Sequence, residues 1–433
     1  MRRRITQDLL AWKDRRDRRP LLLHGARQVG KTHCLQELGR AYDNVAYVNF
    51  ETNLAAGSIF DGDIDPARVV RLLEVETRQA IVPGRTLVIL DEIQACERAL
   101  TSLKYFRERA PEYHVAAAGS LLGVALNRSQ FSFPVGNVDS LTLYPLDLEE
   151  YLWALGDDRL TTEIRTAFAA IEALPTSLHE RALDAYRTYL VTGGMPAAVM
   201  RYVDTGSLQT IPDVQRQILN DYAADMAKYT TAAEAVRVRA AYESIPVQLA
   251  KENRKFQYKL AQSGGTATRL GSAIDWLRLA GAVLKCQKID HGLLPLAAHV
   301  DLASFKLYLD DVGLLTALSA LPQSVVLAAG TIDQTFLGAL TENYVAQALT
   351  ANGHPLYYWT SGGQAELDFV LQLGADVVGV EVKTGHRTQS KSLGVFTDRY
   401  RPAYSIRISS KNFGFENRIK SVPLYAVFCI DPV

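Results

Sequence analysis

The fold of the amino-terminal part of the chain is decided by Gly25-Ala26-Arg27-Gln28-Val29-Gly30-Lys31-Thr32. This segment matches GxxxxGK[ST] at every fixed position and follows Leu21-Leu22-Leu23, an apolar run that predicts a short buried strand. Glycines let the backbone bend until several N–H groups point at one phosphate, and a following helix adds the positive end of its dipole. We therefore expect a loop that binds ATP or GTP, with Lys31 on the β- and γ-phosphates and Thr32 on Mg²⁺.

A second motif follows further along the chain, where the apolar run Thr86-Leu87-Val88-Ile89-Leu90 ends in Asp91-Glu92. Parallel strands that are buried on both faces are typically unbroken apolar runs, and ligands bind at their carboxyl ends. Asp91 is therefore expected to hold Mg²⁺ beside the phosphate loop, while Glu92 orients and deprotonates the attacking water. The alternative is a helix cap followed by a first-turn acid, which is a common arrangement.

A third apolar run, His114-Val115-Ala116-Ala117-Ala118, leads into Gly119-Ser120. The Ser120 hydroxyl is a candidate sensor of the γ-phosphate or of the attacking water. Alternatively, Gly119-Ser120 only turns the chain into a helix that begins near Leu121.

The bulk composition of the 433 residues is that of a folded protein, with 48% apolar and 22% charged residues, and the length suggests about two to four domains. The formal net charge is zero, so any nucleic-acid surface must be a local patch. The cysteines lie far apart without metal-binding spacing, which predicts buried free thiols, and the sequence shows neither a signal peptide nor a membrane span, which predicts a cytoplasmic protein. They are Cys34, Cys96, Cys286 and Cys429. Because no apolar stretch approaches the ~18 residues of a membrane span, no membrane partner is expected.

Alternation of strands and helices in residues 1–153 predicts a P-loop core with a doubly wound parallel sheet. The expected strands are residues 21–24, 44–50, 87–90, 114–118 and 140–143. Residues 154–235 are expected to form a helical lid or linker, broken by a tight turn at Thr192-Gly193-Gly194-Met195-Pro196.

Residues 236–300 predict a winged-helix-like region. Its helices are expected at 240–251, 255–261 and 268–279, with a first wing strand at 281–288. The third helix of such a fold is the usual DNA reader, but winged helices also bind proteins, and the mixed charge here leaves both partners open. The exposed candidates are Thr266, Thr268, Arg269, Ser272, Asp275 and Arg278.

Residues 301–433 contain a second candidate site. Glu381 and Lys383 stand two apart in an apolar strand and therefore face the same way. Asp368 lies on the preceding strand, and Glu342 of an earlier helix would complete a set of three acids and one lysine. Carboxylates suit Mg²⁺, and a neighbouring lysine can orient water for attack on a phosphodiester. Alternatively, Glu381 and Lys383 form a simple ion pair, with the other two acids exposed.

With these motifs assembled, the chain resembles a prokaryotic family of ATP-binding proteins in which an AAA-type P-loop ATPase domain precedes the domain of unknown function DUF4143. The resemblance rests on Gly25–Thr32, Asp91-Glu92-Ile93-Gln94, Gly119-Ser120, Tyr144-Pro145-Leu146, Glu149-Glu150-Tyr151-Leu152, Gly193-Gly194-Met195-Pro196, Glu366-Leu367-Asp368 and Glu381-Val382-Lys383.

The family implies a winged-helix middle and a restriction-endonuclease-like α/β domain, similar to PD-(D/E)xK nucleases, at the carboxyl end. In that superfamily's roles, Glu342, Asp368 and Glu381 hold metal and Lys383 is the lysine. Leu367 replaces the proline of the nuclease signature, which weakens the expectation of cleavage.

The combined expectation is a Mg²⁺-dependent ATPase whose hydrolysis is coupled to the nuclease-like module. Its ligands are ATP and Mg²⁺, and its candidate partners are DNA and further copies of the chain. Two rivals stay open: a nucleotide-switched DNA- or protein-binding module with little turnover, and an ATP-regulated nuclease. The sequence does not choose an arginine finger among Arg107, Arg109 and Arg128.

Overall fold

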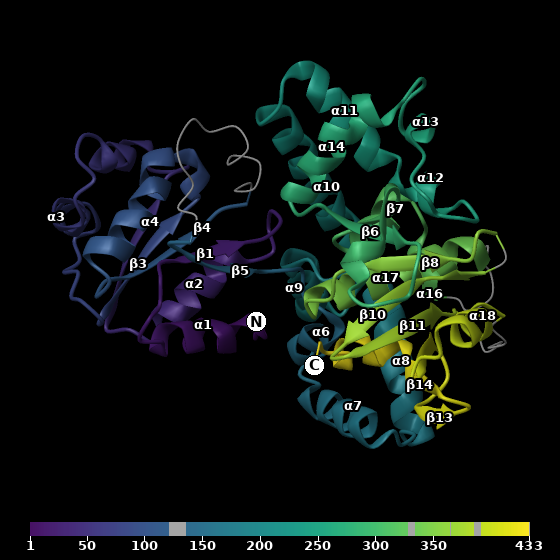
Figure 1. Cartoon of the computed structure of the whole chain (residues 1–433). Helices are drawn as coiled ribbons and strands as arrows, with labels where there is room; N and C mark the ends of the chain where they lie inside the picture. Colours follow the sequence, from purple (N-terminus) through teal and green to yellow (C-terminus); the bar gives the residue numbers. More distant parts are fainter. Residues whose placement is uncertain (121–135, 328–333, 364, 385–390, 433) are drawn as a thin grey trace. The chain divides into compact units, whose positions relative to one another are not determined.

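The computed structural model describes residues 1–120, 136–327, 334–363, 365–384 and 391–432. The chain divides into two compact units, both drawn in Figure 1. The amino-terminal unit is Arg2–Tyr144 with Leu279–Gly281, and the carboxyl-terminal unit is Met1 with Pro145–Arg278 and Ala282–Val433. Among the described residues, none of the helices combines the length and apolar character that crossing a bilayer requires.

A parallel sheet forms the centre of the amino-terminal unit. Its strands are β1 (Leu21–His24), β2 (Asn44–Asn49), β3 (Thr86–Asp91), β4 (His114–Ala118) and β5 (Asp139–Thr142). They lie in the order β2-β3-β4-β1-β5, and every neighbouring pair is parallel. All residues of β3 and β4 are buried, as expected for strands that are covered on both faces. This arrangement confirms the predicted P-loop type of sheet and puts the carboxyl ends of β1, β4 and β3 side by side.

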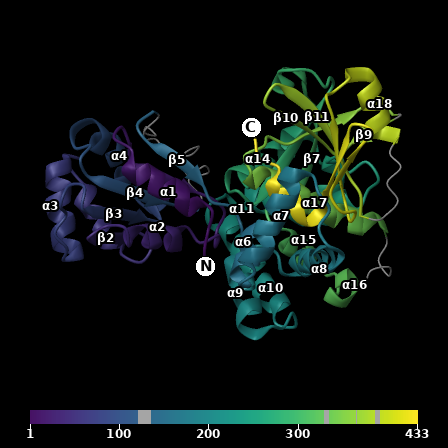
Figure 2. The same cartoon turned by 90° about the horizontal axis from the view of Figure 1, so that it is seen from below.

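Helices cover both faces of this sheet. They are α1 (Ile5–Asp14), α2 (Lys31–Gly39), η1 (Leu54–Phe60), α3 (Pro66–Thr77), η2 (Ile93–Ala95) and α4 (Glu97–Arg109). The chain crosses the sheet in one direction from β1 through α2 to β2. It returns in the opposite direction from β2 through α3 to β3 and then through α4 to β4. Right-handed crossovers therefore place α2 on one face and α3 and α4 on the other. Figure 2 shows the sheet with these helices.

The first half of the carboxyl-terminal unit is helical, as predicted. Its helices are α6 (Leu148–Ala154), α7 (Asp158–Ala170), α8 (Thr176–Thr192), α9 (Pro196–Thr205), α10 (Ile211–Lys228), α11 (Ala232–Glu243), α12 (Ile245–Leu249), α13 (Tyr258–Ala261) and α14 (Ala267–Leu279).

The predicted glycine turn between α8 and α9 is present. Gly193 ends α8 with a φ of +69°, and Pro196 occupies the first turn of α9. The Gly194 N–H donates a hydrogen bond to Oδ2 of Asp311 at 2.6 Å. A Cβ on Gly194 would lie 1.9 Å from the Leu146 carbonyl oxygen, so the packing at this turn admits only glycine.

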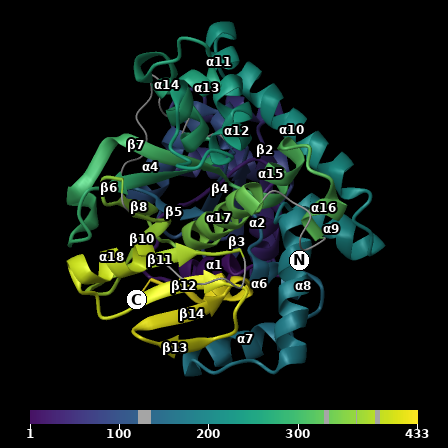
Figure 3. The same cartoon turned by 90° about the vertical axis from the view of Figure 1, so that its right-hand side faces the viewer.

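Two sheets follow in the carboxyl-terminal unit. Their strands are β6 (Val283–Ile289), β7 (Val300–Leu309), β8 (Tyr357–Thr360), β9 (Glu366–Leu367), β10 (Phe369–Leu373), β11 (Asp376–Val382), β12 (Ser405–Ser409), β13 (Gly414–Glu416) and β14 (Ile419–Pro423). One sheet has the order β7-β6-β8-β9, and the other has the mixed order β10-β11-β12-β14-β13, which Figure 3 shows. The remaining helices are η3 (Leu296–His299), α15 (Val312–Leu318), α16 (Gln323–Leu327), α17 (Gln334–Ala351), α18 (Lys391–Tyr400) and η4 (Leu424–Cys429).

The strand that the sequence assigned to a wing belongs to a larger sheet. β6 pairs with β7 in antiparallel fashion and with β8 in parallel fashion. The predicted boundary between residues 300 and 301 therefore falls inside one hairpin, and a separate winged-helix domain stays a prediction. The six candidate reading residues on and before α14 are all exposed, and its apolar Leu270, Ile274 and Leu277 are buried.

Helix α17 is the central buried element of this unit. Polar side chains tie it to the end of β7: Asn343 accepts from the Leu309 N–H at 2.8 Å and donates to the Leu309 carbonyl at 3.1 Å. Gln347 accepts from the Val312 N–H at 3.0 Å. These bonds fix the helix beside β7 and thereby place Glu342, which is fully buried.

Candidate functional site

The phosphate-loop motif forms a turn between β1 and α2. Gly25 has a φ of +145°, and a Cβ there would lie 2.2 Å from the Leu143 carbonyl oxygen. Gln28 and Gly30 have φ of +64° and +97°, and Gly30 caps α2, which begins at Lys31. Left-handed residues next to a helix start turn successive N–H groups toward one point, which is how backbone binds anions.

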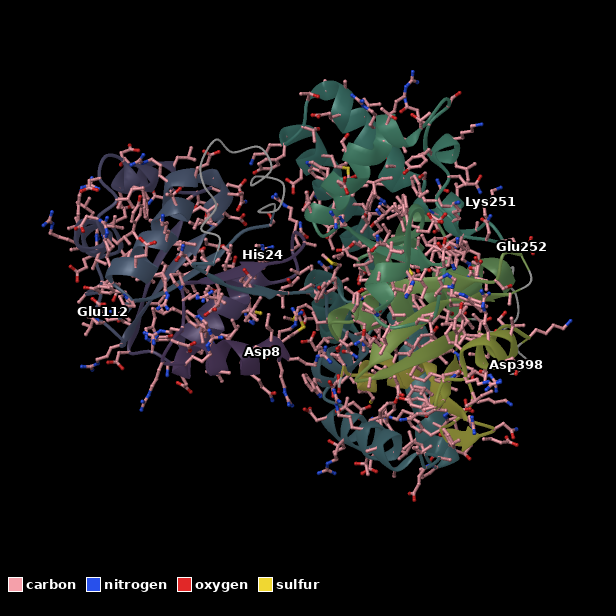
Figure 4. The ribbon with its side chains drawn as sticks, in the orientation of Figure 1. Asp8, His24, Glu112, Lys251, Glu252 and Asp398 are labelled. Atoms are coloured by element: carbon pink, nitrogen blue, oxygen red, sulfur yellow. The ribbon has the colours of Figure 1, made fainter. Side chains whose placement is uncertain are left out.

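The Lys31 side chain lies across this loop. Its ammonium donates to the carbonyl oxygens of Gly25 at 3.1 Å and Ala26 at 2.7 Å, and the residue is buried. The preceding His24, labelled in Figure 4, is the last residue of β1. Burial and the Lys31 charge lower the pKa of His24, so its imidazole is neutral at neutral pH.

The two predicted Mg²⁺ ligands meet at the carboxyl ends of β1 and β3. The Thr32 hydroxyl donates to Oδ2 of Asp91 at 2.7 Å, and the Tyr47 hydroxyl donates to the same oxygen at 2.9 Å. Oδ1 accepts from the Glu92 N–H at 3.0 Å. Asp91 is buried, and all three of these hydrogen bonds come from neutral donors.

The residue after Asp91 has a strained backbone and a held side chain. Glu92 has a φ of +49°, which a non-glycine residue rarely adopts. The Gln94 amide donates to Oε2 of Glu92 at 2.6 Å. Ser120 is buried just beyond β4, the strand between β1 and β3. Its role as a sensor stays a prediction.

The second candidate site is a pocket of about 930 Å³ in the carboxyl-terminal unit. Asp368, Glu381 and Lys383 all line it. The β10–β11 hairpin brings the first two together, because Phe369 pairs with Val380. Lys383 lies 2.9 Å from Oε1 of Glu381, and Asp368 accepts from the Val382 N–H at 2.8 Å.

The fourth predicted member of that site has other partners. Glu342 is not among the residues that line the pocket. It forms ion pairs with Lys306, at 3.0 Å, and with Arg254, and it accepts a hydrogen bond from the Tyr308 hydroxyl. Among the described residues, no group of three or more histidine, cysteine, aspartate or glutamate side chains is arranged to hold a metal ion. The donor set here therefore does not fit the metal that the nuclease resemblance implies.

The arginine-finger candidates are only partly described. Arg107 and Arg109 lie in the last turn of α4, and Arg128 lies outside the described residues.

Three segments of the chain match models of protein families. Residues 17–152 match an AAA domain, residues 183–325 match a domain of unknown function (DUF8612), and residues 337–427 match a domain of unknown function (DUF4143). The chain combines an AAA domain with a DUF4143 domain. The phosphate loop and Asp91-Glu92 lie in the AAA domain, whereas Glu342, Asp368, Glu381 and Lys383 lie in the DUF4143 domain.

The chain is also similar to solved structures at low sequence identity. The Walker-type ATPase PABY2304 of Pyrococcus abyssi shares 14% identity over 73% of this chain and 95% of its own, with a TM-score of 0.46. The ORC2 protein of Aeropyrum pernix, in ADPNP–ADP complexes, shares 13% over 81% and 95%, with a TM-score of 0.37. AMPPCP-bound DnaA of Aquifex aeolicus shares 12% over 63% and 86%, with a TM-score of 0.29. Curated protein sequences give no match.

Two residues of the amino-terminal unit, Tyr47 and Arg3, make contacts near the site that sequence reasoning missed. Tyr47 of β2 reaches Asp91, and the alternation of side chains along that strand could have placed it on a sheet face but not at the carboxylate. Arg3 is buried and donates to the carbonyls of Val29, at 2.8 Å, and Tyr144, at 2.6 Å. Arg3 is one of three consecutive arginines, and nothing in the sequence distinguishes it as the one that contacts the phosphate loop.

Proposed function

We propose that the AAA domain hydrolyses ATP with Mg²⁺ and that nucleotide turnover controls the carboxyl-terminal modules. The observation that carries this proposal is the 2.7 Å contact between Thr32 and Asp91 beside a loop with left-handed residues. Hydroxyl and carboxylate oxygens are the ligands that Mg²⁺ prefers, so this pair fits the ion. Mg²⁺, when bound, supplies neutralisation of charge on the phosphate oxygens.

The other residues of the proposal act on phosphate and on water. When ATP binds, the Lys31 ammonium breaks its hydrogen bonds to the Gly25 and Ala26 carbonyls and donates to oxygens of the β- and γ-phosphates. The amides of the Gly25–Thr32 segment also donate to the phosphates. Glu92 orients the attacking water and accepts its proton, which requires Glu92 to leave Gln94. Ser120 contacts the γ-phosphate or that water from the neighbouring strand end.

A nucleotide-switched binding module is the second candidate function, and the Gln94 contact favours it. At 2.6 Å, the amide holds the carboxylate that would otherwise activate water. If this hydrogen bond persists with ATP bound, the protein binds nucleotide tightly and turns it over slowly. Gln94 would then keep the protein in its ATP-bound state until a partner releases Glu92.

Steady-state ATPase assays on matched variants separate the two functions. We expect Glu92→Gln to lower turnover by about 10²- to 10⁴-fold while ATP binding is kept, because it removes a general base. Turnover that survives Glu92→Gln contradicts the assignment of this residue. A rise in turnover in Gln94→Ala supports the switch, and a fall supports a positioning role for Gln94.

The proposal also covers the binding partners of the protein and its location in the cell. The exposed face of α14 is the candidate surface for DNA or a protein, although the Arg278–Asp275 contact at 3.6 Å offsets one of its cations. We propose a cytoplasmic protein, supported by four free cysteines. ATPase rates with single-stranded, duplex and branched DNA, together with a sizing experiment with ATP, test the partner and self-association. A rate that no DNA changes removes DNA from the proposal.

A further inference from the structure

A buried lysine joins two carboxylates in the carboxyl-terminal unit. Lys306 of β7 has no exposed side-chain surface, and its ammonium lies 3.0 Å from Oε1 of Glu342 and 2.6 Å from Oε1 of Glu366. It also lies over the Tyr358 ring, 4.9 Å from the centroid. A lysine is buried this deeply only when anionic groups compensate its charge.

A second cation completes this cluster from another segment. Arg254, in the segment between α12 and α13, pairs with the other oxygen of Glu342. Gly338 lies one turn before Glu342 on α17, and a Cβ there would lie 2.8 Å from Nη2 of Arg254. A glycine thus leaves room for the guanidinium, so the ion pair is part of the packing.

The charges within the cluster cancel. Two carboxylates, Glu342 and Glu366, face two cations, Lys306 and Arg254. Glu366 and Arg254 also line the 930 Å³ pocket, as do Asp368 and Glu381. Glu366, Asp368 and Glu381 are therefore among the carboxylates that line the pocket, and Lys306 and Glu342 lie outside its lining, where the Lys306 ammonium pairs with Glu366.

We infer that the Lys306 ammonium takes the place of a divalent metal ion between Glu342 and Glu366, at the wall of the 930 Å³ pocket, which we call the DUF4143 pocket. An ammonium donates three hydrogen bonds to carboxylates but has no empty orbital with which to polarise a phosphodiester or activate water. Glu342 and Glu366 therefore keep the charge balance of a metal site without its hydrolytic chemistry, and neither acid is left to bind a metal ion in the pocket.

Lys383 does not alter this conclusion. Its ammonium is paired with Oε1 of Glu381, while Oε2 of Glu381 is buried and has no hydrogen-bond partner among the described residues. Glu381 and Asp368 together offer two carboxylates, which is fewer than the three acids of the predicted set. These two acids supply the control in the experiment below.

Calorimetric titration of the full chain with Mn²⁺, without nucleotide, tests the inference. The Asp91→Asn background removes the P-loop ligand, so that any site detected lies elsewhere. We expect this protein to bind no Mn²⁺ in the pocket. Addition of Lys306→Gln should create one Mn²⁺ site that the Asp91→Asn protein lacks, and further addition of Glu342→Gln should lower its affinity at least about tenfold.

Two results would overturn the inference. One is Mn²⁺ binding with Lys306 intact that disappears when Asp368→Asn is added. The other is a Lys306→Gln protein that keeps its circular dichroism spectrum and still gains no site. The matched control is Lys288→Gln, since Lys288 also lines the pocket but pairs with Asp290 and Asp301, and it should gain nothing. The titration with Lys306 intact decides the question even if Lys306→Gln unfolds.

Discussion

The phosphate-loop region and the DUF4143 domain both contain a buried carboxylate, but the groups that surround the two carboxylates differ. Asp91 receives its hydrogen bonds from the Thr32 and Tyr47 hydroxyls and the Glu92 amide, all of which are neutral. Glu342, in contrast, pairs with two cations of the chain.

The comparison distinguishes two kinds of buried carboxylate: one that is hydrogen-bonded by neutral groups, and one that is paired with cationic side chains of the chain itself. Burying a carboxylate is costly unless a positive charge accompanies it. At Asp91 those hydrogen bonds come from neutral groups, an arrangement that is compatible with the proposed Mg²⁺ site. At Glu342 the positive charge comes from Lys306 and Arg254, so this carboxylate stabilises the packing of the domain.

The largest effect that tests this comparison is expected for Lys31→Ala. Loss of the ammonium removes charge-assisted hydrogen bonds to phosphate, so ATP affinity should fall by at least about 10- to 100-fold. Calorimetry or a fluorescent ATP analogue measures the change. The control is Lys104→Ala, an exposed lysine of α4 that pairs with Glu108 and should leave affinity unchanged. Unchanged affinity in Lys31→Ala would remove the phosphate loop from the account.

A smaller effect is expected for Tyr47→Phe. This change deletes one of the neutral donors to Asp91, so turnover should fall by about tenfold while ATP binding changes little. Tyr113→Phe is the matched control, because it removes a tyrosine hydroxyl from the same unit without touching Asp91. Equal turnover of Tyr47→Phe and the control would show that Tyr47 does not position the carboxylate.

A third prediction concerns stability and not nucleotide chemistry, at a buried acid whose hydrogen bonds come from backbone amides. Asp311 accepts from the Gly194 and Leu314 N–H groups, and burial raises its pKa to about 6. The neighbouring Asp310 has its pKa raised by burial and by Asp311. Because the pKa of Asp311 is higher in the folded state, its contribution to stability is present at acid pH and is lost as the pH rises through about 6.

Urea unfolding at pH 4 and pH 7 measures that contribution. Relative to Asp311→Asn, the wild type should lose roughly 2 kcal/mol of unfolding free energy between these two pH values. Asp213→Asn, on exposed α10 surface beside Arg216, is the control and should show no such difference. A pH dependence that Asp311→Asn retains in full would show that another group is responsible.

Much of the amino-terminal unit could be predicted from its sequence because its signals are local. The apolar runs that end at His24 and Ala118 coincide with β1 and β4, since buried strands must be apolar throughout. The glycines at 25 and 30 adopt the positive φ that a phosphate loop requires. In the carboxyl-terminal unit, Asp368 and Glu381 were brought together correctly because the Gly374 turn joins neighbouring strands.

The remaining features depend on contacts between residues far apart in the sequence. Glu342 pairs with Lys306 and Arg254, and no local pattern tells whether an acid on an apolar helix faces a metal or a lysine. Likewise, the sequence of β6 predicts a wing strand, but β6 pairs in parallel with β8, which follows α17 much later in the chain. Tyr47 was missed because its hydroxyl acts at the end of a neighbouring strand.

The most direct test of the central claim is a titration of the full chain with ATP, with and without Mg²⁺. We expect Mg²⁺ to tighten ATP binding in the wild type and this dependence to be lost in Asp91→Asn, in which the Thr32–Asp91 pair no longer offers a carboxylate. ATP binding that is equally Mg²⁺-dependent in Asp91→Asn, or absent in the wild type, would contradict it.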